Sequence, residues 1–136
     1  MKLVLGIAVA LLVALGAGWA WGASGRSALS RALQAAEARD YLLEGRSAVL
    51  DARLDIYSVN FGDASRHLEA ARTALLAATA RLNGLRRGED AKPLEAALAR
   101  IHDAQRMAGQ LNQGANALAA DAAKTINAVL AETATR

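Results

Sequence analysis

Apolar residues recur along this chain at alternating intervals of four and three, and this spacing constrains the fold more than any other feature. One such row occupies residues 26–58, and similar rows follow in residues 61–86 and 91–133. An α-helix brings residues at these intervals onto one face, which can then pack against another helix. The chain has one proline, Pro93, and is rich in alanine, the best helix former. The pattern therefore predicts an all-α fold.

The first row is long, and it contains two polar residues. Its members are Leu29, Leu33, Ala36, Asp40, Leu43, Ser47, Leu50, Leu54 and Tyr57. A second row on the same helix widens the apolar face and consists of Ala35, Leu42, Val49 and Ile56. We expect the first row to touch one helix and the second row to touch another, which suits a bundle better than an isolated two-stranded coil.

Charged residues flank the first row at intervals of seven. Acidic residues follow one side, namely Glu37, Glu44 and Asp51, and arginines follow the other, namely Arg39, Arg46 and Arg53. These are the e-like and g-like positions that set partner choice in coiled coils, so the six residues are candidate partner contacts. The alternative is a solvated rim, because exposed ion pairs contribute only about 0–1 kcal/mol each.

A turn signal separates the first and second segments at Asn60, Phe61, Gly62 and Asp63. Asn60 is a good N-cap, and the charge of Asp63 suits the N-terminal helix dipole. A connection this short predicts antiparallel neighbours. The second row reads Ala64, Leu68, Ala71, Leu75, Ala78, Leu82 and Leu85. Before the third segment, Asp90 is a candidate cap and Pro93 fits a first helical turn.

The third segment keeps its spacing through two glycines, Gly109 and Gly114. Its row reads Leu94, Ala97, Ile101, Ala104, Ala108, Leu111, Ala115, Leu118, Ala122, Thr125 and Val129. We therefore predict one helix over about 91–133 and a three-helix antiparallel, coiled-coil-like bundle in residues 26–136. A break near Gly114 would instead give four helices. A helix of about 40 residues would outreach the second one and leave apolar surface that self-association or a partner could cover.

The N-terminal segment lacks charge from Leu3 to Ala23. As a helix it would be about 31 Å long, which matches a hydrocarbon core of about 30 Å. Lys2 precedes it, and Trp19 and Trp21 lie near its end, where indole rings favour the membrane interface. Residues 1–25 are thus predicted to form a single transmembrane anchor. A cleaved signal peptide is the alternative, although the apolar run is longer than a usual signal core.

The predicted location is the bacterial inner membrane, with the bundle in the periplasm. Lys2 and the α-amino group favour an inside N-terminus, whereas Arg26 and Arg31 favour the reverse orientation. We therefore expect the lipid bilayer as one partner, and a second copy or another envelope protein as the other.

The sequence contains no motif typical of a catalytic or metal-binding site. There is no cysteine, and the two histidines, His67 and His102, lack the Glu-x-x-His spacing of a di-iron bundle. Charges are interspersed, which argues against nucleic-acid binding. We expect no enzymatic activity and no cofactor. The predicted function is a membrane-tethered interaction module that acts by helix–helix packing. The alternative is a periplasmic bundle that binds a lipid or another apolar ligand.

Overall fold

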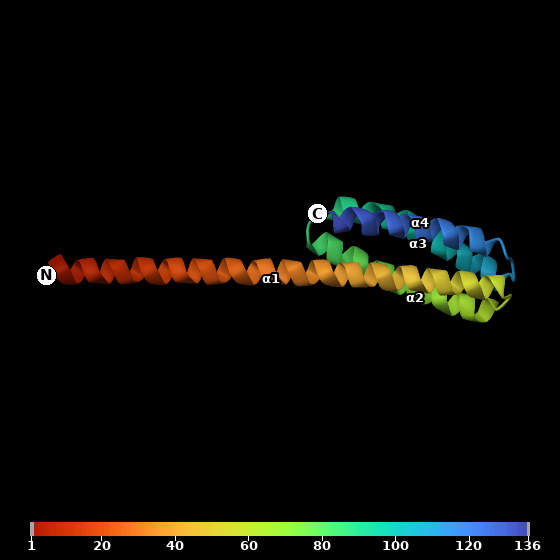
Figure 1. The fold of residues 1–136 in the computed structure, drawn as a ribbon, viewed down its shortest axis with the longest axis horizontal. Coiled ribbons are helices and arrows are strands. Elements are labelled where there is room, and N and C mark those ends of the chain that lie inside the picture. Colours follow the sequence, from red (N-terminus) through yellow and green to blue (C-terminus); the bar gives the residue numbers. More distant parts are fainter. Residues whose placement is uncertain (1, 136) are drawn as a thin grey trace. The chain divides into compact units, whose positions relative to one another are not determined.

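The computed structural model describes the backbone of residues 2–135 and the side chains of residues 26–135. This part of the chain is entirely helical and without strands, which confirms the predicted all-α class. The helices are α1 (Lys2–Tyr57), α2 (Phe61–Gly84), α3 (Gly88–Gly109) and α4 (Ala115–Ala134), as Figure 1 shows. The chain divides into two compact units, Met1–Leu33 and Gln34–Arg136. The second unit contains the bundle.

The bundle is a ring of antiparallel neighbours that closes between α1 and α4. α2 packs on α3, and α3 packs on α4. The Arg81 Nε lies 2.9 Å from a Glu37 carboxylate oxygen and joins α2 to α1. The Arg53 Nε donates to the Asn116 side-chain oxygen at 2.9 Å and joins α1 to α4. Because the connections are short, each helix packs antiparallel to the one before it.

Alternating large and small side chains fill the centre of the bundle. The predicted row of α2 is buried from Ala64 to Leu82, as expected. The row of α3 is buried from Leu94 to Ala108, and α4 contributes Ala115, Ala122 and Val129. Alanine layers let helix axes approach closely, while leucine and isoleucine layers supply most of the apolar area.

The prediction of one helix over about 91–133 is wrong, and the four-helix alternative is the structure. α3 ends at Gly109, and α4 begins at Ala115. Leu111, which the seam spacing placed in the core, lies in the turn and is exposed. The Asn112 side chain accepts a hydrogen bond from the Gly114 N–H at 2.8 Å, and this stabilises the turn. Helices α2, α3 and α4 therefore have similar lengths of 24, 22 and 20 residues, so the unpaired length expected of a 40-residue third helix does not arise.

The three connections between the helices of the bundle share one backbone conformation. Val59, Arg86 and Leu111 have φ values of 62°, 58° and 55°, in the left-handed region. After each helix, two N–H groups bond back to carbonyls of its last turn, for example Asn60 to Asp55 and Val59 to Ile56. This is the Schellman motif, which usually has glycine at the left-handed position. Here a non-glycine residue occupies that position each time.

The start of α3 also differs from the expectation. The helix begins at Gly88, so Pro93 lies in its second turn rather than its first. The residue at the N-cap position is Arg87, and it makes no side-chain capping bond. Asp90 does not cap the helix; its buried carboxylate instead pairs with the Arg87 Nε at 2.6 Å. The ion pair is local because Arg87 and Asp90 are one helical turn apart.

The predicted membrane anchor, residues 1–25 with Lys2, Trp19 and Trp21, lies outside the residues whose side chains are described. Over residues 26–135, whose side chains are described, no helix combines the length and hydropathy needed to cross a bilayer. The first helix, which was predicted over about 26–58, begins further upstream at Lys2.

Candidate functional site

The bundle uses the opposite face of α1 from the one that the first row predicts. Over residues 26–57 of α1, the buried residues are Ala38, Leu42, Gly45, Ala48, Val49, Ala52 and Ile56. The expectation that the first row packs inside the bundle is therefore wrong. Both rows satisfy helical spacing, but the first contains Asp40 and Ser47. Burying an unpaired carboxylate is costly, so the row without polar residues faces the core.

Small residues allow α1 to lie close to α2, a feature that sequence reasoning missed. Ala38, Gly45 and Ala52 recur every seven residues on the buried face. A Cβ atom added to Gly45 would lie 2.9 Å from the Leu75 Cδ2 atom and 3.6 Å from the Ala71 carbonyl oxygen. The heptad spacing of these three small residues was the available signal.

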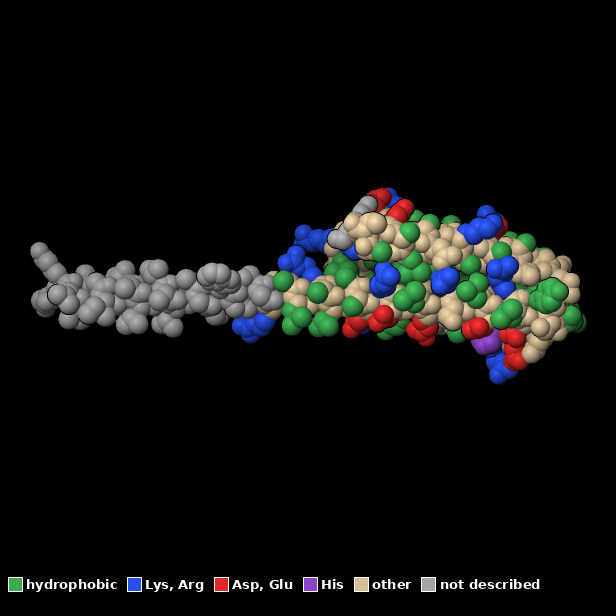
Figure 2. Space-filling model, viewed as in Figure 1, with side chains coloured by type: hydrophobic (Ala, Val, Ile, Leu, Met, Phe, Trp, Pro, Cys, Tyr) green, Lys and Arg blue, Asp and Glu red, His purple; other side chains and the backbone are tan. Residues whose placement is uncertain are grey.

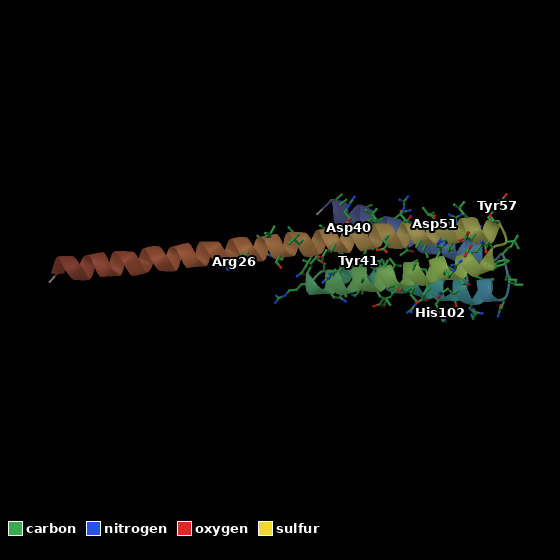
Figure 3. All side chains as sticks on the ribbon, turned by 90° about the horizontal axis from the view of Figure 1, so that it is seen from below. Arg26, Asp40, Tyr41, Asp51, Tyr57 and His102 are labelled. Atoms are coloured by element: carbon green, nitrogen blue, oxygen red, sulfur yellow. The ribbon has the colours of Figure 1, made fainter. Side chains whose placement is uncertain are left out.

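The first row leaves an apolar face of α1 in solvent. Within the bundle unit, we call this face the outward stripe; it consists of Ala36, Asp40, Leu43, Ser47, Leu50, Leu54 and Tyr57. Leu43 is 41% exposed, Leu54 67% and Tyr57 80%. Only Leu50 is half-buried. Figure 3 labels Asp40 and Tyr57 on α1, with Tyr57 at the end of the helix, beside the turn to α2.

The two charged rows border the outward stripe on opposite sides. Figure 2 views this face: basic side chains follow one edge of α1, acidic side chains follow the other, and hydrophobic groups lie between them. Structure and sequence agree on this placement, because residues one position before and after a seam lie on its two flanks.

Some of these charges have partners inside the bundle, and others do not. Glu37 pairs with Arg81 of α2, and Arg53 bonds to Asn116 of α4. Arg39, Glu44 and Asp51 are exposed and form no hydrogen bond or ion pair with another described residue. The half-buried Arg46 has its Nε atom out of solvent and without a hydrogen-bond acceptor among the described residues. The unpartnered charges thus border the middle of the stripe.

Hollows adjoin the part of α1 whose side chains are described. One, of about 300 Å³, lies where the stripe meets α4 and is lined by Leu50, Arg53, Leu54, Tyr57 and Asn116. Another, of about 280 Å³, is lined by Ala35, Ala36, Ala38, Arg39, Leu42, Leu82, Arg87, Thr133 and Ala134. The first hollow adjoins the outward stripe, because Leu50, Leu54 and Tyr57 belong to both.

No known protein family, curated protein or solved structure matches this chain. Its function is therefore inferred from the geometry of the bundle.

The predicted helix corner is a structural feature. Asn60 is the N-cap of α2, and its side-chain oxygen accepts from the Asp63 N–H at 3.5 Å, which confirms the predicted cap. Phe61 is buried, and Asp63 pairs with Arg66. A Cβ at Gly62 would meet nothing within 4 Å, so the corner does not require glycine there. These residues start the helix.

Many titratable groups of the bundle form ion pairs, most of them between residues three positions apart in one helix. The half-exposed His67 lies 2.7 Å from an Asp55 carboxylate oxygen, and His102 is exposed. Hydrogen bonds from Arg72 lower the pKa of Glu69 to about 2. Over residues 26–135, no group of three or more His, Asp or Glu side chains is placed to hold a metal ion. The outward stripe is the exposed apolar surface from which a function is inferred below.

Proposed function

We propose that this chain is a membrane-tethered interaction and assembly module without catalytic activity. It acts by helix–helix packing, with a second copy or with another envelope protein. The observation that carries this proposal is the outward stripe, in which Leu43, Leu54 and Tyr57 are exposed on a helix whose opposite face is buried. Removing apolar surface from water is worth about 25 cal/mol per Å², so covering the stripe favours association.

The spacing and borders of the stripe support a helical partner. Its members alternate at four and three along α1, as the seam of a coiled coil does. Charges of opposite sign border its two sides, an arrangement that sets orientation and discriminates between partners.

The tether is proposed from the sequence of residues 1–25. The uncharged run Leu3–Ala23 has bilayer length, with Lys2 before it and Trp19 and Trp21 near its end. The bundle then faces the periplasm of a bacterial inner membrane. We expect the full chain to resist extraction by alkaline carbonate, and protease added to spheroplasts to degrade the bundle. Release by carbonate would refute the tether, and protection in intact spheroplasts would reverse the orientation.

Site-specific photo-crosslinking tests the stripe itself. A photoreactive amino acid replaces Leu54 in the full chain in cells, and the matched control replaces Leu76, an exposed leucine of α2 that is 46% accessible. We expect covalent adducts from position 54 and few from position 76. Adducts with a second copy or with another envelope protein at position 54 support an interaction module. Equal yields at the two positions, or none at either, refute the assignment of the stripe as the binding surface.

A second candidate function, binding of an acidic apolar ligand, is favoured by the hollow lined by Arg39, Arg87, Leu42 and Leu82. Its volume of about 280 Å³ suits only a small ligand, since binding pockets usually span about 300–1,000 Å³. The Arg87 Nη2 atom is buried without an acceptor in the described part of the chain. Mass spectrometry of organic extracts from the purified protein tests this candidate, and Ala35→Leu, at a half-buried position that lines the hollow, should abolish any bound ligand. Extracts that contain no ligand above a control protein refute it.

A further inference from the structure

The outward stripe has a definite heptad register. Its spacing places Asp40, Ser47 and Leu54 at a positions and Ala36, Leu43, Leu50 and Tyr57 at d positions. The acidic row then occupies e positions, one residue after each d. The arginine row occupies g positions, one residue before each a. The core-facing residues, including Leu42 and Val49, occupy positions on the far side of the helix, so the register leaves the whole a/d seam available.

The charges of this register distinguish between pairing directions. In a parallel two-stranded coiled coil, each g residue faces the e residue five positions later on the other helix. Arg39 would then face Glu44 of the second copy, and Arg46 would face Asp51 of the second copy. In an antiparallel pair, g faces g and e faces e, so arginines would oppose arginines and carboxylates would oppose carboxylates. Like charges in these positions are destabilising.

The bundle leaves unpartnered the charges that parallel pairing needs. Arg39, Glu44 and Asp51 make no hydrogen bond or ion pair with described residues, and Arg46 has an unsatisfied Nε atom. The two remaining members of the charged rows are engaged elsewhere: Glu37 pairs with Arg81, and Arg53 bonds to Asn116.

Those two engaged members also have no charged counterpart in a parallel dimer. Five positions after Arg53 lies Ser58, and five positions before Glu37 lies Ala32. The charged residues that the bundle leaves unpartnered are therefore the same residues that a parallel dimer would pair.

We propose that the outward stripe binds the same stripe of a second copy, parallel and in register. This inference rests on the proposed function and names its partner. Two chains tethered to one membrane would present α1 in the same direction, which suits a parallel pair. Tethering also raises the effective concentration of the second copy, so the modest seam can associate without high affinity.

The polar a positions fix the register of the pair at a cost in affinity. Asp40 faces Asp40 of the second copy, and Ser47 faces Ser47. A polar a position is a recognised device for specifying register and oligomeric state. Asp40→Asn removes the repulsion between the two carboxylates and keeps a polar layer. It should strengthen the dimer by about three- to tenfold in dissociation constant.

Disulfide crosslinking of the full chain in membranes tests the direction and the register. The chain has no cysteine, so each introduced thiol is the only one. Ala36→Cys and Ser47→Cys place a thiol at a d and an a position, and both positions face themselves in a parallel, in-register pair. The matched control is Ala99→Cys, on an exposed position of α3. We expect both stripe variants, but not the control, to give a disulfide-linked species of twice the chain mass on mild oxidation.

Charge reversal tests the proposed pairs. Each test chain carries Ser47→Cys together with two reversals, either Arg39→Glu with Arg46→Glu or Glu44→Arg with Asp51→Arg. Each chain alone should lose crosslinking by at least about tenfold. Two chains of different tag size, one of each kind, should crosslink to each other when they are co-expressed. A merely misfolded variant would not recover, so rescue shows that the charged rows of the two chains meet, and the direction of the pair follows from self-crosslinking at positions 36 and 47.

The possible outcomes separate this inference from the proposed function. Self-crosslinking at both stripe positions with rescue by the complementary chain supports the parallel dimer. Self-crosslinking at only one of the two positions indicates an antiparallel or shifted pair and overturns it. Absence of self-crosslinking, together with photo-adducts of another mass at position 54, also overturns the dimer while the interaction module stands. Absence of both refutes the two proposals together.

Discussion

Leucine-to-alanine substitution on the two faces of α1 tests which face holds the bundle together. Leu42 is fully buried, and Leu54 is 67% exposed, although both occupy apolar rows of the same helix. Truncating a fully buried leucine removes its transfer free energy and leaves a cavity, which together cost about 3–5 kcal/mol. Leu54 has about a third of its surface covered. Its truncation should cost about 0.5–1 kcal/mol, a third of the roughly 2 kcal/mol that full burial provides.

Urea unfolding of the full chain in mild detergent, followed by far-ultraviolet circular dichroism, measures both free energies. Helix propensity is nearly the same in the two variants, since each exchanges leucine for alanine. Dilute protein removes any contribution from self-association. A domain of this size has a stability of about 5–15 kcal/mol, so the Leu42→Ala loss is readily resolved. Equal losses in the two variants would show that the first row is buried after all, and the assignment of the outward stripe would be wrong.

Three further outcomes test the helix contacts and turns. Gly45→Leu should destabilise the bundle by about 3 kcal/mol or more in the same urea assay, because even a Cβ would lie 2.9 Å from the Leu75 Cδ2 atom; an unchanged midpoint would contradict the close packing of α1 on α2. Val59→Gly should stabilise it by about 1 kcal/mol, because a β-branched residue at φ 62° is strained and glycine is not; no gain in thermal unfolding would contradict that cost. The Glu69 carboxyl should titrate at about 2 in NMR spectra, below its ordinary 4.5, because Arg72 donates hydrogen bonds to the ionised form. The stabilisation is complete above pH 4.5 and is lost as the pH falls towards 2; Arg72→Ala should return the pKa upward, and an ordinary value in the parent chain would contradict the pair.

The helical class and most of the core could be predicted from sequence, because helical spacing is a local property. The row of α2 from Ala64 to Leu82 is buried as its spacing indicated. Asn60 caps α2 by accepting a hydrogen bond from the N–H of Asp63, only three residues away. The positions of the charged rows on the two sides of the stripe also follow from helical spacing. Each of these features depends on residues a few positions apart.

Two features depended on distant contacts, and local spacing could not decide them. The seam of residues 91–133 is continuous on either side of Leu111, so only the benefit of packing α4 back on the bundle selects a turn there. On α1, both apolar rows have regular helical spacing, and packing against α2 and α4 determines which of them is buried. Leu75 fits against Gly45, whereas a core built on the first row would have to bury Asp40. The shape and polarity of the neighbouring helices thus decide which apolar face of α1 is buried in the bundle. The other apolar face stays exposed, and it is the face that we propose for a partner.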